Sequence, residues 1–236
     1  MRICTITVRG GSKGVPGKNW RVVAGLPLYA HSVVQAVESG AFDRVVVTSD
    51  APEVLAGAAG FGATDVVERP AELASDTAGK VPAIVHAVLE VEGRLGLAFD
   101  TVVDLDATSP LRIVDDIHGA IALLETNGYE SVITGAEARR SPYFNLVEED
   151  SATGVVQVSK PLAQGVLRRQ DAPRSFDMNA SIYVWRRDAL AARAAVFFPT
   201  THLFEMPPER SLDIDSEFDF DIVNWLMQSR KGTTNG

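Results

Sequence analysis

The chain has 236 residues, of which 22% are charged and 46% hydrophobic, and its formal net charge is -9. This length fits one large α/β domain, or one domain with a small insertion, and is sufficient to bury most of the surface of the unfolded chain. The acidic balance excludes general nucleic-acid binding, and no apolar run approaches the roughly 18 residues that a membrane-spanning helix needs. The first residues, MRICTITVRGG, have the pattern of a strand rather than of a signal peptide, so we expect a cytoplasmic location.

The first predicted elements are a strand and a helix that flank a glycine-rich loop. The stretch RICTITV (2–8) is rich in β-branched side chains, which predicts a strand with the single cysteine, Cys4, buried in it. The stretch PLYAHSVVQAVESG (27–40) spaces its apolar residues at helical intervals and ends in a glycine. A strand, a loop and a helix therefore open the chain.

Strands and helices continue to alternate after this unit. Residues 45–47 form a short apolar run, which is typical of a parallel strand covered on both faces. We predict that Asp50 caps the next helix, because Pro52 falls in the first turn and Glu53 follows the cap by three residues. The remaining predicted elements are strands at 63–67, 101–106, 130–135 and 180–187 and helices at 82–92, 115–126 and 219–230. In the helix at 82–92, the spacing predicts that Ile84, Val85, Val88 and Leu89 face inward.

This alternation predicts an α/β fold with a doubly wound, mostly parallel sheet. Ligands of such sheets bind beyond the carboxyl ends of the strands, where this chain carries RGGSKG, TSD, DATSPLR and, later, DIDSE. The pattern changes between residues 138 and 175, where two short strands around DSATG predict a hairpin. We predict that 138–175 is an inserted dimerisation arm on a single domain spanning 1–236.

The loop VRGGSKGVPGKN (8–19) combines four glycines with three cationic side chains, those of Arg9, Lys13 and Lys18. Glycines let backbone N–H groups converge on an anion, and the cations can neutralise it, which predicts a phosphate-binding loop. The loop does not match the Walker motif, because residue 12 is serine and Asn19 follows the lysine of GK. It does not match the dinucleotide motif G-x-G-x-x-G either, because the stretch reads GGSKG.

Five blocks of the sequence resemble the acylneuraminate cytidylyltransferases, the synthetases of CMP-sialic acid and related nonulosonic acids, and the match covers essentially residues 2 to 226. The loop resembles the family pattern R-x-x-S-K-x-x-x-x-K-N, and the later blocks are ERPAELASDTA, DLDATSPLR, FDMNASIYVW and ERSLDIDSEFDF. The resemblance implies a Rossmann-like fold of the nucleotide-diphospho-sugar transferase type. It also implies that CTP and a 2-keto sugar acid react to give a CMP-sugar and pyrophosphate.

The resemblance also implies roles for individual residues. Arg9 and Lys18 are the predicted catalytic residues, because they would neutralise charge on the triphosphate and the departing pyrophosphate. The predicted CTP-binding residues are Arg9, Ser12, Lys13, Lys18, Asn19, Arg69 and Thr77. Asp213 and Asp215 stand two apart on an extended segment, so both carboxylates point to one face and predict a Mg²⁺ site.

The predicted sugar side is defined by cationic, polar and aromatic residues of the second half. Its predicted residues are Asp106, Arg168, Arg169, Asn179, Tyr183, Phe197 and Phe198, with Arg174 as a further candidate for the sugar carboxylate. Asp106 is a departure, because the sialic acid enzymes carry glutamine there. An ionised aspartate only accepts hydrogen bonds, so it would contact a different sugar or join the metal site.

Three alternatives stay open at the level of the sequence. One is a Kdo cytidylyltransferase, although that branch usually carries arginine and leucine where this loop has KGV (13–15). The second is a nucleotidyltransferase that uses UTP or GTP. The third is a non-catalytic nucleotide-binding module, which the presence of both Asp213 and Asp215 disfavours. The predicted partners are CTP, the sugar acid and a second copy of the chain, with no nucleic acid and no membrane.

Overall fold

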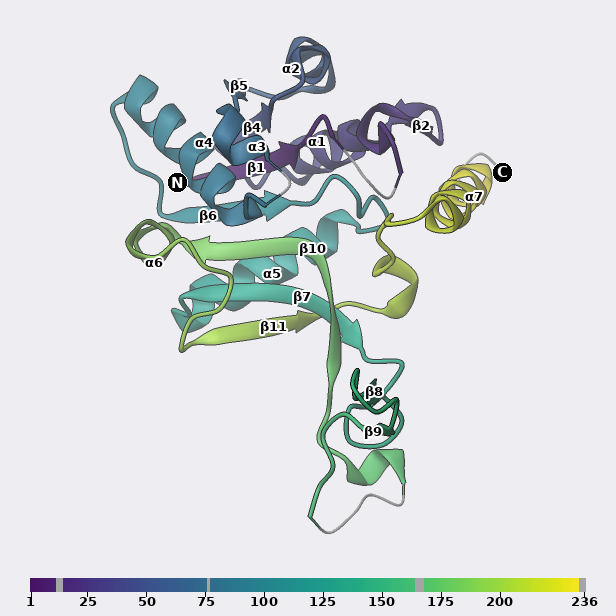
Figure 1. The fold of residues 1–236 in the computed structure, drawn as a ribbon. Coiled ribbons are helices and arrows are strands. Elements are labelled where there is room, and N and C mark those ends of the chain that lie inside the picture. The colour runs from purple at the N-terminus through teal and green to yellow at the C-terminus, as the bar shows by residue number, and fades with distance from the viewer. Residues whose placement is uncertain (12–14, 76, 164–167, 234–236) are drawn as a thin grey trace.

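A seven-stranded sheet forms the centre of the molecule, with the strand order β11-β7-β10-β6-β1-β4-β5 (Figure 1). The structure is a computed structural model that describes residues 1–11, 15–75, 77–163 and 168–233. The strands are β1 (Arg2–Val8), β4 (Arg44–Ser49), β5 (Asp65–Glu68), β6 (Thr101–Leu105), β7 (Ser131–Glu137), β10 (Phe176–Arg186) and β11 (Thr201–Glu205). Neighbouring strands are parallel except at β10, which runs antiparallel to both β6 and β7. The predicted doubly wound, mostly parallel sheet is confirmed.

Helices cover both faces of this sheet. The helices α1 (Leu28–Ser39), α2 (Pro52–Ala58) and α5 (Val114–Asn127) pack on one face, and α4 (Lys80–Leu95) and α6 (Arg187–Ala192) pack on the other. Side chains alternate along a strand, so Ile6 of β1 joins the first core and Ile3 joins the second. By the same alternation, Asp104 of β6 lies on the face covered by α4, as Val102 does two residues earlier. No described helix is both long enough and apolar enough to cross a membrane.

The last helix brings the C-terminal part of the chain to the opening loop. Helix α7 (Glu217–Thr233) packs Phe220 and Val223 into a small core with Val15 and Leu28. The shorter elements are β2 (Val22–Val23), β3 (Leu26–Pro27), α3 (Ala71–Ala74) and the 3-10 helices η1 (Lys18–Trp20), η2 (Ala59–Phe61), η3 (Arg169–Asp171) and η4 (Pro208–Arg210).

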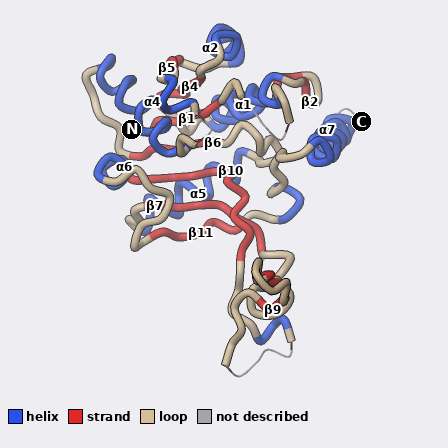
Figure 2. Tube along the Cα trace, in the orientation of Figure 1, coloured by secondary structure: helices blue, strands red, loops and turns tan. Residues whose placement is uncertain are grey.

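An arm projects from the sheet between the C-terminal end of β7 and the N-terminal end of β10 (Figures 1 and 2). It contains the antiparallel pair β8 (Val147–Glu149) and β9 (Val156–Val158), joined by a turn with Gly154 in the left-handed conformation. The predicted hairpin is therefore present. The assignment of 138–175 as a dimerisation arm stays a prediction.

Two local predictions are wrong. Asp50 does not cap α2, because the N-cap is Ala51 and makes no side-chain capping bond; the Asp50 carboxylate instead accepts a hydrogen bond from the Gly10 amide. Leu89 does not face the core, because it is 48% exposed. Helix α4 extends past its predicted end, to Leu95, and the stripe of its side chains that contacts the sheet is narrower than predicted.

Candidate active site

A cleft of about 480 Å³ lies at the carboxyl ends of β1 and β6. The chain leaves β1 toward β4 on one side and later returns to β6 on the other, so the cleft lies where the strand order reverses. This is the position at which open α/β sheets bind ligands. The charged and amide side chains that line it are those of Arg9, Lys18, Asn19, Arg69, Lys80, Asp106, Asp213 and Asp215.

The described part of the opening loop is held from both sides. The Gly10 amide donates to Asp50 Oδ1 over 2.8 Å, and a Cβ on Gly10 would lie 3.3 Å from the other carboxylate oxygen. Asn19 Nδ2 donates to the Arg9 carbonyl over 2.9 Å, which places Asn19 as a support of the loop. Arg9 itself donates to the Gly11 carbonyl. Ser12 and Lys13 lie outside the described residues.

The two ends of the chain meet at Lys18. Its Nζ donates to the Ile214 carbonyl and lies 3.4 Å from Asp215 Oδ1. Gly17 precedes it with φ of 64°, and a Cβ there would lie 2.7 Å from the Trp20 ring nitrogen, so the turn requires glycine. This contact places the predicted catalytic lysine beside the predicted metal-binding pair.

The pair Asp213 and Asp215 has properties that fit a divalent cation. Burial, followed by the neighbouring Asp215 charge, raises the pKa of Asp213 to about 6, so a bound cation would relieve repulsion between the two groups. No group of three or more metal-binding side chains occurs among the residues that the structure describes. The protein would therefore supply two carboxylates and leave the other positions to phosphate and water, as Mg²⁺ commonly requires.

Arg69 is a buried cation at the wall of the cleft. Burial lowers its pKa, and its Nη2 donates to the Thr48 carbonyl over 3.2 Å. Its Nε is buried and has no hydrogen-bond partner among the described residues, so a ligand could accept from it. Thr77 does not line the cleft, and its hydroxyl lies 3.4 Å from the Ser75 hydroxyl; its predicted role stays a prediction.

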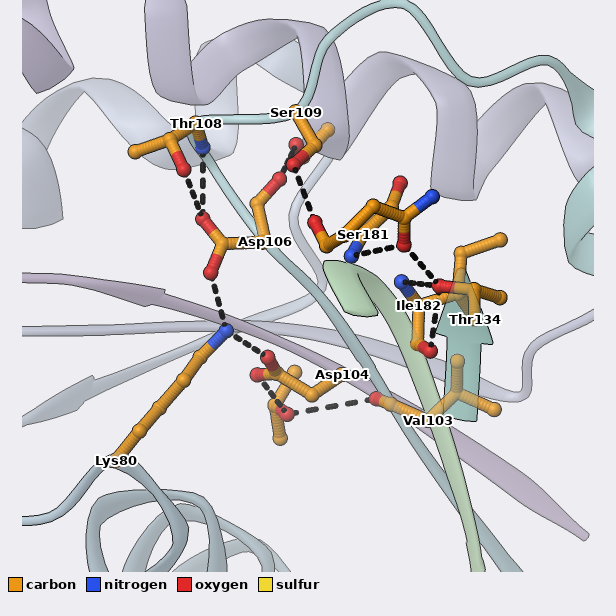
Figure 3. A network of polar contacts seen from close by, with 12 residues as sticks. Lys80, Val103, Asp104, Asp106, Thr108, Ser109, Thr134, Ser181 and Ile182 are labelled. Carbon is orange, nitrogen blue, oxygen red and sulfur yellow. Dashed lines mark hydrogen bonds and ion pairs between the residues drawn. The ribbon is translucent and has the colours of Figure 1, made fainter. Parts of the chain in front are cut away.

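A buried ion cluster at the end of β6 was not predicted from the sequence (Figure 3). Lys80 Nζ lies 2.6 Å from Asp104 Oδ2 and 2.7 Å from Asp106 Oδ2. Asp106 Oδ1 accepts from both the amide and the hydroxyl of Thr108, and Asp104 Oδ1 accepts from Thr5. The signal in the sequence was the aspartate within the apolar run TVVDL, since a buried carboxylate requires a partner.

Arg112 is a second residue that the sequence did not single out. It is fully buried, and burial lowers its pKa to about 10. Its guanidinium donates to the carbonyls of Asp106 and Ser181, both over 2.6 Å, and also contacts Ser32 and Gln35. Arg112 therefore ties the loop after β6 to β10 and to α1.

The predicted sugar residues of β10 are engaged within the protein. Asn179 Oδ1 accepts from Thr134 and from the Ser181 amide, and its Nδ2 donates to Ser211 over 3.0 Å. Tyr183 is 7% exposed and stacks on Trp185 with ring centroids 5.4 Å apart. Neither residue lines the cleft, so direct sugar contacts by Asn179 and Tyr183 stay predictions.

Asp106 lines the cleft, but the other predicted sugar residues whose side chains the structure describes do not. Phe197 and Phe198 precede β11, whose start pairs with the start of β7, so they lie at the edge of the sheet opposite the cleft. This placement does not support the predicted contact with a sugar in the same chain. Arg168, on the arm, pairs with Asp171, and Arg174 pairs with Glu205. The side chain of Arg169 is outside the described part of the structure.

Comparisons with known proteins agree with this fold. Residues 3–227 match the family described as Cytidylyltransferase. A Campylobacter coli protein named post-translational flagellin modification protein B is 41% identical over 97% of this chain and 95% of its own length. The CMP-N,N'-diacetyllegionaminic acid synthase of Campylobacter jejuni is 41% identical over 95% of this chain and 94% of its own length. An N-acylneuraminate cytidylyltransferase of Streptococcus agalactiae is 29% identical over 92% of this chain and 51% of its own length.

A solved structure of similar fold is that of CMP:2-keto-3-deoxy-manno-octonic acid synthetase complexed with CTP. It superposes with a TM-score of 0.70 over 97% of this chain and 99% of its own, at 17% identity. The family match and the curated relatives identify the chain as a nucleotidyltransferase, and its fold is of the α/β class. More particularly, the chain belongs to the cytidylyltransferase family.

Proposed function

We propose that this enzyme transfers a cytidylyl group from CTP to a 2-keto nonulosonic acid, with an acid of the legionaminic type as the first candidate. The anomeric hydroxyl oxygen of the acid attacks the α-phosphorus, the bond from that phosphorus to the bridging oxygen breaks, and pyrophosphate leaves. The hydroxyl proton passes to solvent. The observation that carries this proposal is the 41% identity to a CMP-N,N'-diacetyllegionaminic acid synthase along nearly the whole chain, together with a cleft that contains the loop cations and both aspartates.

The cleft offers groups suited to each part of CTP. Arg9 and Lys18 come from one loop and can stabilise negative charge on the phosphates, mainly as it develops on the leaving group. Arg69 can donate its unpaired Nε–H to an acceptor on the cytosine edge. These contacts require positioning and charge rather than covalent catalysis.

A Mg²⁺ ion is part of the proposal. Asp213 and Asp215 would hold it, and it would neutralise phosphate charge. We expect Asp213→Asn to raise the Mg²⁺ concentration for half-maximal activity by at least about tenfold, since even supporting residues of metal sites contribute that much. Glu217→Gln is the control, because this nearby carboxylate pairs with Arg21 and does not line the cleft. An unchanged Mg²⁺ curve for Asp213→Asn would reject this ligand.

The experiment that tests the whole proposal measures pyrophosphate release from each of the four nucleoside triphosphates. Each nucleotide is offered N,N'-diacetyllegionaminic acid, N-acetylneuraminic acid and Kdo as acceptors. We expect release with CTP and a nine-carbon acid. Absence of release with CTP and every acid would reject the proposal, and preference for Kdo would favour the eight-carbon alternative.

We also propose that the chain forms a homodimer through its arm. Apolar side chains are exposed there, including those of Phe144, Leu146, Val147 and Val156. Exposed apolar groups gathered on one projection favour burial against a partner. Sedimentation of the intact chain should give twice the mass of one copy. Val147→Glu should shift it toward the monomer, whereas a monomeric wild-type chain would contradict this proposal.

A further inference from the structure

The cluster of Lys80, Asp104 and Asp106 forms part of the wall of the cleft. Lys80 is the first residue of α4, and its Nζ lies 5.3 Å from the centre of the Tyr183 ring. The Lys80 side chain is 30% exposed, the Asp106 side chain 18%, and Asp104 is fully buried. The cluster therefore has one end in the core and one end in the cleft.

Stability alone does not account for this arrangement. A buried ion pair loses its hydration, so an apolar replacement of the whole group is often as stable or more stable. Asp104 sits in a strand whose other residues, Thr101, Val102, Val103 and Leu105, are all buried, and an apolar side chain would fit that setting. A charged cluster that reaches the cleft from such a position points to a role in the cleft.

The cluster presents one donor next to one acceptor. An ammonium has three N–H groups. Lys80 donates one to Asp106 Oδ2 and forms an ion pair with Asp104 Oδ2, so at least one N–H remains for a ligand. Asp106 Oδ1 accepts two bonds from Thr108, whereas its Oδ2 accepts from Lys80 and keeps a second lone pair. Because Asp106 uses both oxygens in this way, it is placed as part of the cluster rather than as a free carboxylate.

The charge of the cluster separates it from the phosphate-binding groups. The carboxylate of Asp106 already balances the positive charge of Lys80, even without Asp104, so the cluster carries no excess positive charge. Phosphates and the sugar carboxylate would be attracted to Arg9 and Lys18 instead. A neutral group that both donates and accepts a hydrogen bond matches the pair Lys80 and Asp106.

We propose that Lys80, together with Asp106, determines acceptor specificity by binding a neutral hydroxyl or acylamino group of the sugar acid. Lys80 donates to the oxygen of that group, and Asp106 Oδ2 accepts its O–H or N–H. Both types of group offer a donor and an acceptor, so they share this chemistry. The inference rests on the proposed cytidylyl transfer. It adds Lys80 to Asp106, which the sequence already predicts as a sugar residue, and assigns the pair a ligand group.

The test compares Lys80→Met, the double variant Lys80→Met/Asp104→Asn, and Arg94→Met as a control. Methionine removes the ammonium at similar length, and the second substitution removes the buried charge that Lys80 neutralises. Arg94 lies in the last turn of the same helix and is outside the cleft. Steady-state rates of pyrophosphate release give KM for CTP and for the acceptor, and calorimetric titration gives Kd for CTP.

For Lys80→Met we expect the acceptor KM to rise about tenfold or more, the usual effect of losing a hydrogen bond from a charged donor. KM and Kd for CTP should change less than twofold. The double variant should recover thermal stability but keep the raised acceptor KM. Arg94→Met should match the wild-type protein in both KM values.

Recovery of the acceptor KM in the double variant would overturn the inference, because Lys80 would then act only by neutralising Asp104. Equal losses for CTP and acceptor would overturn it as well. A rise confined to N,N'-diacetyllegionaminic acid would identify an acylamino group, and a rise shared with N-acetylneuraminic acid would identify a group common to both acids. A wild-type chain inactive with every acid rejects the proposed function itself, whereas an active wild-type chain with an unaffected variant rejects only the role of Lys80.

Discussion

Replacement of Arg112 by methionine should destabilise the protein by about 3 kcal/mol. The guanidinium makes five hydrogen bonds, to Gln35, Ser32, the Asp106 carbonyl and both oxygens of Ser181. At about 1 kcal/mol net for each bond, their loss costs roughly 5 kcal/mol. Removal of a buried charge offsets part of this cost.

Two features of the site keep the penalty from being larger. The Asp106 carbonyl still accepts from the Ser32 hydroxyl over 2.9 Å, and the Ser181 carbonyl still accepts from the Asp106 amide over 3.1 Å. Neither buried carbonyl is therefore left without a donor. For a chain of this size, 3 kcal/mol corresponds to a Tm lower by about 6–12 °C.

Urea unfolding followed by far-UV circular dichroism measures the change, with Arg94→Met as the matched control. Arg94 is half-exposed and donates to one carbonyl, so its loss should cost less than about 1 kcal/mol. A destabilisation by Arg112→Met no larger than that of the control would refute the role assigned to the guanidinium. Because Arg112 also holds the Asp106 backbone, the acceptor KM should rise in the same variant.

Three further predictions concern the loop, the backbone of Ala180 in β10 and the ion cluster. Lys18→Met should lower kcat by about 100-fold, because it removes a group that stabilises charge in the transition state, whereas CTP affinity should fall less than tenfold. Equal losses in kcat and in CTP affinity would contradict a catalytic role for Lys18. Ala180 has φ of 51°, so Ala180→Gly should relieve about 1–2 kcal/mol of backbone strain and lose up to about 1 kcal/mol to the greater entropy of the unfolded chain. The free energy of unfolding should therefore rise by about 0.5 kcal/mol. A clear decrease in that free energy, measured by urea unfolding, would argue against strain at Ala180. Burial opposes ionisation of Asp106, but Lys80 and Thr108 outweigh it and hold its pKa at about 2, below the value in the unfolded chain. The ionised carboxylate therefore contributes to folding stability above about pH 4, and this contribution is lost as the pH falls toward 2. The difference in unfolding free energy between wild type and Asp106→Asn should therefore narrow by about 2 kcal/mol between pH 6 and pH 2, and a constant difference would reject the shifted pKa.

The sequence by itself determined the order of strands and helices and the place of the phosphate-binding loop. Apolar residues repeat at intervals set by backbone geometry, so the elements could be read locally, as for β1 and α1. The family blocks identified Lys18 and Asp215 as parts of one site, and their proximity follows from the fold.

Only the tertiary structure decided which polar groups pair within the cleft. Asp50 has the local pattern of a helix cap, yet it binds the Gly10 amide of the opening loop, because β1 and β4 are neighbours in the sheet. Lys80 begins α4 and Asp104 lies beyond the end of that helix in the sequence, so their contact depends on how α4 crosses the sheet. Such pairings depend on distances through space, which no local spacing encodes.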